Sequence, residues 1–238
     1  AVFWVGADRG NLYIAVRSEM PPDGQLLTRA VPDGDRDIIR TVYDDSIEVV
    51  VHPHLGKKDG DRRYFHFIVN ERGALYDLSI DEGNPQNPVN SAWRLKNWRF
   101  ANKVLDGYWH VEMAIPFAEI GATPEDLQRP WGLRVCRNWQ RPWDQSHWES
   151  VSTNFEDVPT MPRIVLGDEL PVVQVISLVS GGRPHIELSV ANPSGSPIPT
   201  MVFISDTWSR NPPTEREWTT TIPAGGKESF VLDPPHGG

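Results

Sequence analysis

Residues 137–148 concentrate side chains that could bind a sugar. The segment holds Trp139, Trp143 and Trp148, together with Arg137 and Asn138. A pyranose has an apolar face of C–H groups, on which aromatic rings stack, and a rim of hydroxyls, which planar amide and guanidinium groups can hydrogen-bond. We interpret the segment as a loop whose polar and aromatic groups contact a sugar. The alternative is that the rings cover one end of the fold or pack against a second domain, since exposed tryptophan is costly when nothing covers it.

Two further polar candidates stand in segments of alternating apolar and polar residues. Glu48 lies in residues 46–52 and His66 in residues 64–70, each on the polar side of its segment. If the two strands are neighbours, these side chains form a polar floor beneath the sugar. The alternative is a solvated strand face that carries a surface ion pair.

Calcium is the metal that the sequence favours. Asp33, Asp35 and Asp37 alternate along the chain, as carboxylates do in compact oxygen-ligand loops, but the closing Glu of the twelve-residue calcium loop is absent. The alternative is an acidic surface loop. His52 and His54 hint at zinc, with no third ligand placed by spacing.

Catalytic motifs are missing from the sequence. It contains no Gly-x-Ser-x-Gly, no phosphate-binding loop and no His-Glu-x-x-His. Glu48 and Glu112 could form a glycosidase pair, yet a small β-sandwich rarely supplies a deep cleft. Met113 is expected in the core and His66 on the opposite face, so they do not converge on a haem. We expect no enzyme activity in this chain and no organic cofactor.

Composition excludes several partners. The 238-residue chain has a net charge of −9, which argues against nucleic acid and anionic membrane because both require basic patches. No apolar run approaches the ~20 residues of a membrane helix. The single cysteine, Cys136, rules out intrachain disulfides and multi-cysteine zinc sites.

The expected fold class is all-β, an antiparallel β-sandwich. Period-two alternation predicts strands with one apolar and one polar face, and Trp109 and Trp131 fall at core positions of two of them. The single expected helical turn is at residues 116–120. The strands are expected at residues 12–17, 46–52, 64–70, 108–115 and 131–137.

A domain boundary is expected after residue 167. Residues 1–167 contain 12 prolines and residues 168–238 contain 10, and a short Gly- and Pro-containing linker separates them. Five candidate strands in residues 168–238 suggest a smaller immunoglobulin-like sandwich. The abrupt start and the Pro-Pro-His-Gly-Gly end suggest that both domains are truncated parts of a longer protein.

Four stretches, taken in order, resemble one known family. Residues 43–48, Tyr-Asp-Asp-Ser-Ile-Glu, resemble the "aromatic-x-Asp-Asp-Ser-Val-Glu" strand of family 9 carbohydrate-binding modules. Residues 67–77 resemble its "F-x-V-N-x-x-G-x-x-x-D" hairpin, and residues 107–117 its "G-W-x-x-E-x-A-I-P-F" segment. Residues 131–138 resemble its "W-G-x-x-x-x-R-N" strand, which Trp148 follows as in the family. The resemblance covers residues 1–167.

This resemblance implies a non-catalytic, sugar-binding β-sandwich, often appended to secreted glycoside hydrolases and often holding calcium. Two rings clamp a terminal sugar in the family. Glu48 matches the sugar-binding glutamate, Trp148 matches the second ring, and Tyr43 stands at or next to the place of the first. The expected partners are an oligo- or polysaccharide and neighbouring domains of the same polypeptide, in a secreted, periplasmic or cell-surface location. The alternative is a structural or interaction module that has lost the sugar site and serves as a spacer.

Overall fold

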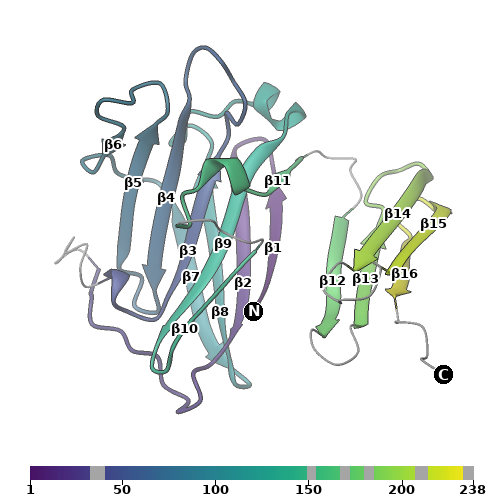
Figure 1. The fold of residues 1–238 in the computed structure, drawn as a ribbon, viewed down its shortest axis with the longest axis horizontal. Coiled ribbons are helices and arrows are strands. Elements are labelled where there is room, and N and C mark those ends of the chain that lie inside the picture. Colours follow the sequence, from purple (N-terminus) through teal and green to yellow (C-terminus); the bar gives the residue numbers. More distant parts are fainter. Residues whose placement is uncertain (33–40, 149–153, 167–171, 180–184, 207–213, 233–238) are drawn as a thin grey trace. The chain divides into compact units, whose positions relative to one another are not determined.

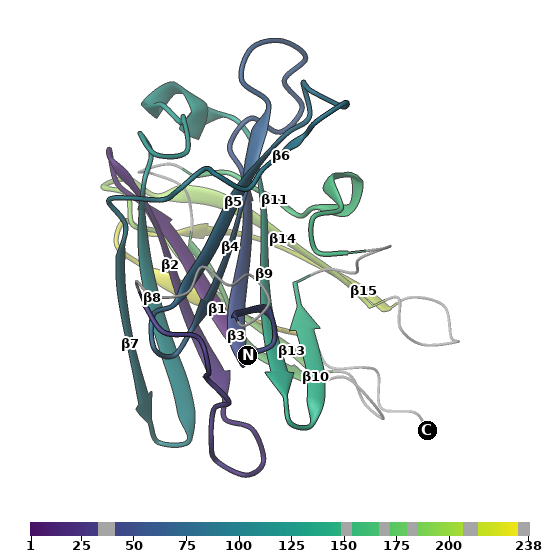
Figure 2. The ribbon, with the colours of Figure 1, turned by 90° about the vertical axis from the view of Figure 1, so that its left-hand side faces the viewer.

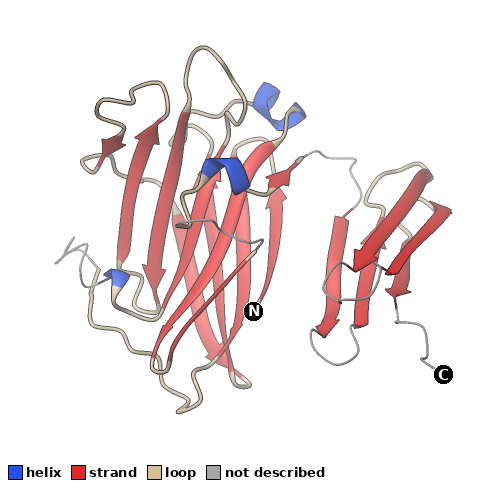
Figure 3. Ribbon diagram, in the orientation of Figure 1, coloured by secondary structure: helices blue, strands red, loops and turns tan. Residues whose placement is uncertain are grey.

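The computed structural model describes residues 1–32, 41–148, 154–166, 172–179, 185–206 and 214–232. The chain divides into two compact units, Ala1–Leu166 and Gly167–Gly238. Both are built from antiparallel strands (Figures 1 and 3), so the expected all-β class is confirmed. The candidate calcium ligands Asp33, Asp35 and Asp37 lie outside the described residues.

The first unit is a sandwich of two sheets, seen edge-on in Figure 2. The four-stranded sheet has the order β1-β2-β8-β7, with β1 at Val2–Ala7, β2 at Asn11–Glu19, β7 at Arg99–Leu105 and β8 at Tyr108–Pro116. The seven-stranded sheet has the order β10-β9-β3-β4-β5-β6, and β11 also pairs with β9. Its strands are β3 Ser46–His52, β4 Arg63–Asn70, β5 Leu75–Asp81, β6 Val89–Asn90, β9 Trp131–Gln140, β10 Trp143–His147 and β11 Arg163–Ile164.

The core of this unit lies between the two sheets, because alternate residues of each strand point inward. The predicted core positions of Trp109 and Trp131 are confirmed, with 1% and 0% of each residue exposed. The principal inward-facing residues of the central strands are Leu12, Ile14, Val16, Ile47, Val49, Val51, Phe65, Phe67, Val69, Leu133 and Val135.

Two short 3-10 helices are present, η1 at Pro124–Gln128 and η2 at Val158–Thr160, and Thr41 and Val42 before β3 are also helical. The helical turn expected at residues 116–120 is present as hydrogen-bonded turns. Glu119 N–H donates to the Pro116 carbonyl at 3.0 Å, and Ile120 N–H donates to the Phe117 carbonyl at 3.1 Å.

Residues 137–148 were expected to form a loop, and that expectation is wrong. They form the end of β9 and most of the β9–β10 hairpin, paired from Trp143↔Gln140 to His147↔Cys136. Only Arg141 and Pro142 lie between the strands. The high density of tryptophan suggested a binding loop, but aromatic residues favour strands, and the alternation continues through both arms of the hairpin.

The second unit contains five strands in two sheets, β12-β13-β16 and β14-β15. A small cluster of Val190, Val202, Ile222 and Phe230 forms its core, with Trp218 packed against it. All five expected strands are found, at β12 Val172–Val179, β13 His185–Ala191, β14 Ile198–Asp206, β15 Thr214–Ile222 and β16 Lys227–Leu232. The immunoglobulin-like type of this unit stays a prediction.

Candidate functional site

Two aspartates of the family-like strand motif are buried and brace one end of the seven-stranded sheet. Asp44 accepts hydrogen bonds from the backbone N–H groups of Arg29 and Ala30, at 2.8 and 2.9 Å, and from Asn70 Nδ2 at 2.8 Å. Asp45 accepts the backbone N–H of Gln140 at 2.6 Å. These contacts tie the start of β3 to the ends of β4 and β9. The two aspartates of the motif thus hold the ends of β3, β4 and β9 together beside the candidate site.

Glu48, His66 and Asn138 meet on the outer face of this sheet, the face turned away from the core. Glu48 pairs with Cys136 and Ile68 on the neighbouring strands, and this register brings the three polar side chains together. Glu48 Oε2 lies 3.0 Å from His66 Nε2, and Asn138 Nδ2 donates to Glu48 Oε1 at 2.6 Å. The structure therefore joins Glu48 to His66, as the alternation of their strands suggested, and adds Asn138.

His66 carries a positive charge in this cluster. Burial alone would lower the pKa of the imidazole, but hydrogen bonds to Glu156 (2.6 Å) and Glu48 outweigh it and raise the pKa to about 9. At neutral pH the ring is an imidazolium that donates to one carboxylate from each nitrogen. His66 thereby fixes the orientation of Glu48 on one side and Glu156 on the other.

Accessible groups stand above this buried floor. Glu48, His66 and Asn138 are 6%, 8% and 2% exposed, respectively. Gln145 of β10 is exposed and donates from Nε2 to Asn138 Oδ1 at 2.8 Å. Trp143, two residues away on the same face, is 69% exposed. The floor is therefore too buried to be the main contact surface, and Gln145 and Trp143 are the groups that a ligand can reach.

Gln145 and Glu156 are absent from the site residues predicted from the sequence. The alternation of Trp143, Gln145 and His147 could have indicated Gln145, had residues 137–148 been assigned to strands. Glu156 carries no comparable signal, because it reaches His66 across 90 positions of sequence from an irregular segment.

Arg137, Trp139 and Trp148 lie on the opposite side of the hairpin, turned towards the four-stranded sheet. The Arg137 guanidinium lies 3.8 Å from the centroid of the Trp139 ring, and its Nη2 donates to Asp144 Oδ2 at 2.6 Å. Trp148 packs against Phe3 of β1, with ring centroids 5.2 Å apart. The structure does not bring these three candidates to the Glu48 cluster. Arg137 and Trp139 alternate with Asn138 along β9 and so face the other side, and Trp148, which follows β10, packs against Phe3.

Tyr43 belongs to the same end of the sheet as Trp143. It is 57% exposed and lies three residues before β3. The backbone carbonyl of its neighbour Asp44 accepts a hydrogen bond from Gln140 Nε2 at 3.3 Å, and Gln140 pairs with Trp143. Two exposed rings thus flank the end of β9.

The rest of the outer face is covered. Residues 154–161 run over it, and buried Arg134 donates to the carbonyl oxygens of Phe155 at 2.9 Å and Thr160 at 2.7 Å. Beneath this cover lie Val50 and Tyr64, in a small apolar cluster. Near β10, by contrast, Trp143 and Gln145 of this face are exposed.

Cys136 of β9 lies on the outer face of the seven-stranded sheet, where it pairs with Glu48 of β3. The thiol is free and buried, and burial, together with the Glu48 charge, raises its pKa well above the usual range. It is a packing residue with little thiolate at neutral pH.

Metal-binding clusters are not found in the part of the chain that the structure describes, where no three His, Cys, Asp or Glu side chains are placed to share an ion. His52 and His54 bond instead to carboxylate and amine neighbours: His52 Nε2 lies 2.9 Å from Glu82 Oε2, and His54 Nδ1 lies 2.9 Å from Lys57 Nζ. None of the described helices has the length and apolar character needed to cross a bilayer.

No family model matches the chain, and no curated protein matches it. Among solved structures, it is similar to a carbohydrate binding module family 9 (CBM9) from Caldicellulosiruptor kristjanssonii in complex with glucose. That match has a TM-score of 0.47 and 15% identity, and covers 69% of this chain and 75% of the other. A CBM9 from the same organism in complex with cellotriose matches with a TM-score of 0.43 and 12% identity, over 69% of this chain and 73% of the other. Both structures are of the family whose motifs the sequence resembles.

Proposed function

We propose that the first unit is a non-catalytic carbohydrate-binding module whose sugar site lies at the β10 end of the seven-stranded sheet. One observation carries the proposal: the exposed Trp143 ring stands beside Gln145, which is anchored through Asn138 to the buried Glu48–His66 pair. An aromatic face next to rigidly held polar groups is the combination that a pyranose requires.

Each part of the site has a distinct role in this proposal. Trp143, and Tyr43 at the same end of the sheet, stack on the C–H face of the sugar and supply most of the affinity, at ~1 kcal/mol per ring beyond the area that each buries. Gln145 and the partly exposed Glu156 bind hydroxyls. Glu48, His66 and Asn138 hold those two side chains in place, so that little side-chain entropy is lost on binding.

Further features of the proposal come from the family resemblance. The chain forms part of a larger secreted protein that acts on polysaccharide, and calcium supports its loops. Asp33, Asp35 and Asp37 remain the candidate ligands for that ion.

Calorimetric titration of the full chain with a panel of gluco-, xylo- and manno-oligosaccharides tests the site. Trp143→Ala should lower affinity for the best ligand at least tenfold, and Glu48→Gln should lower it severalfold by loosening Asn138 and His66. Tyr108→Ala is the matched control, because it removes a 36%-exposed ring from the other sheet. If Trp143→Ala binds the best ligand with unchanged affinity, the sugar site is not on this face of the sheet.

A structural or interaction role is the second candidate. It is favoured by the placement of Trp148, the ring predicted for the second half of a clamp, which is partly buried against Phe3 and the core and does not stand beside the Glu48 cluster. The absence of binding to any member of the oligosaccharide panel would support this role over the first.

A further inference from the structure

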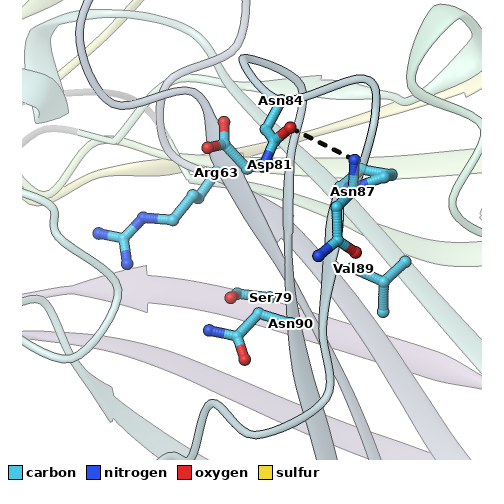
Figure 4. Close-up of a pocket in the computed structure, with 8 residues that line it drawn as sticks. Arg63, Ser79, Asp81, Asn84, Asn87, Val89 and Asn90 are labelled. Atoms are coloured by element: carbon cyan, nitrogen blue, oxygen red, sulfur yellow. Dashed lines mark hydrogen bonds between the residues drawn. The ribbon is translucent and has the colours of Figure 1, made fainter.

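A concave site lies at the opposite end of the seven-stranded sheet from the Glu48 cluster. It is a pocket of about 310 Å³ between the ends of β4 and β5, strand β6 and the connection before it (Figure 4). The pocket is lined by Arg63 and Asp81, which pair with each other where β4 begins and β5 ends. The other end of β4 is the one near the Glu48 cluster, where Asn70 pairs with Ser46. Ser79 of the pocket lining pairs with the core residue Phe65, so the pocket lies on the face opposite to Glu48.

The oxygens of three lining residues hold the pocket wall in shape. Asp81 Oδ1 accepts the N–H of Gly83 at 2.7 Å, and Asn84 Oδ1 accepts the N–H of Asn87 at 3.3 Å. Asn90 Oδ1 accepts two backbone N–H groups, from Ala92 and Trp93, both at 3.1 Å. The wall is thus built before any ligand arrives.

Four lining residues keep side-chain polar atoms that make no hydrogen bond in the part of the chain that the structure describes. The NH₂ groups of Asn84 and Asn90, the whole side-chain amide of Asn87 and the hydroxyl of Ser79 have no hydrogen-bond partner within the described ranges. Figure 4 shows Ser79, Asn87 and Asn90 around a common space. These groups offer several donors and a few acceptors to one ligand.

The charge balance of the pocket selects the class of ligand. Arg63 is held by Asp61 through two hydrogen bonds, Nε to Oδ1 at 2.9 Å and Nη2 to Oδ2 at 2.6 Å, so its charge is already compensated. The Asp81 carboxylate and the Arg62 guanidinium both lie beside Gly83, so this end of the pocket has no excess of positive charge to attract an anion. Free NH₂ donors and the nearby guanidinium disfavour a metal ion, which needs oxygen ligands. Amide and hydroxyl groups in a concave wall suit a neutral polyhydroxylated ring.

We propose that this pocket is a second carbohydrate subsite, which binds one pyranose residue through the exposed Asn84, Asn87 and Asn90, with the buried Ser79 in its wall. The choice of a sugar as ligand rests on the function proposed for the first unit. Two sites on one unit would raise its avidity for a polysaccharide above the affinity of either site, provided that one chain can reach both or that neighbouring chains are available.

Two-dimensional amide NMR of the full chain tests the subsite, because it reports on each site separately. Cellotriose, xylotriose, mannotriose and CaCl₂ are titrated in turn. We expect one trisaccharide to shift two groups of signals, those of residues 81–91 and those around Glu48 and Gln145. In the double variant Asn87→Ala/Asn90→Asp, the signals of residues 81–91 should need at least fivefold more sugar to reach half of their full shift. The titration of the signals around Glu48 and Gln145 should be unchanged. Asp at position 90 keeps the oxygen that Ala92 and Trp93 need, so the wall is preserved.

Matched controls separate the possible outcomes. Asn97→Ala removes an exposed amide outside the pocket and should change neither group. In Glu48→Gln only the second group should weaken. Sugar shifts confined to residues 81–91 would uphold the subsite and overturn the proposed primary site. Shifts confined to the Glu48 region, shifts of residues 81–91 with CaCl₂ alone, or no shift with any sugar would overturn the subsite.

Discussion

The two faces of the β9–β10 hairpin contain similar residues with different roles. The inner face holds Arg137, Trp139 and Asp144, whose ion pair and cation–π contact join the strands where the hairpin faces the other sheet. The outer face holds Asn138 and Trp143, which lead from a buried polar cluster to an exposed ring. A shift of one residue in the chain moves a side chain from one face to the other, because strand side chains alternate between faces. Residue type alone therefore cannot separate the exposed Trp143 from the partly buried Trp139.

The largest effect expected on the outer face is a pH dependence of stability from His66. Its folded-state pKa of about 9 exceeds the ordinary value of 6.5. The protonated ring therefore stabilises the folded state fully below pH 6.5, and this contribution to the free energy of unfolding is lost as pH rises towards 9. The full loss corresponds to about 3 kcal/mol. Urea denaturation between pH 6.5 and 8.5 should show it, and His66→Gln should flatten the curve.

Other titrating groups do not imitate this slope. Burial lowers the pKa values of His52 and His54, so they make stability rise with pH until their unfolded forms have lost the proton, which is opposite in sign to the effect of His66. The raised pKa of Cys136 acts only near pH 9 and above. A flat profile in the wild-type chain between pH 6.5 and 8.5 would contradict the imidazolium assigned to His66.

On the inner face, Trp148→Ala should lower the free energy of unfolding by about 2–3 kcal/mol, somewhat less than for a fully buried tryptophan. The ring packs against Phe3 and the main core. Chemical denaturation measures the loss, and sugar affinity should be unchanged in calorimetry. The opposite result, intact stability with lost affinity, would restore the clamp role that the family resemblance gives to Trp148.

Arg137→Met should cost about 1 kcal/mol of stability. It keeps a long apolar stem over Trp139 but removes the charged contacts with Asp144 and Ser146. Thermal unfolding would register this as a drop of a few degrees in Tm. A reduced affinity for sugar without a change in Tm would mean that Arg137 reaches the ligand.

Gln145→Ala should have the smallest effect, about a fivefold loss of sugar affinity, which corresponds to the ~1 kcal/mol of one neutral hydrogen bond. Stability should be unaltered, since Gln145 is exposed. Calorimetry of this variant beside Asn97→Ala would show whether Gln145 contacts the ligand, and equal affinities in the two variants would exclude it.

Much of the fold could be predicted from the sequence, because alternation of apolar residues directly reports which strand face is buried. Glu48 and His66 were assigned to one polar face for this reason, and they meet at 3.0 Å. The side of the sheet on which Trp139 and Trp148 lie could not be predicted, because a loop is expected from the sequence at residues 137–148. Side chains alternate between two faces in a strand but not in a loop. Glu156 lies beyond any local pattern, because tertiary packing alone brings it to His66.

The buried Cys136 thiol opposite Glu48 can be used to measure how often the region of the candidate site opens. A thiol reagent can modify it only when the β3–β9 region opens transiently, so the labelling rate measures the free energy of that local opening. A ligand that binds only the closed form should slow labelling in proportion to its occupancy. A single native cysteine thus serves as an internal gauge of whether the candidate site is filled, with no tryptophan altered.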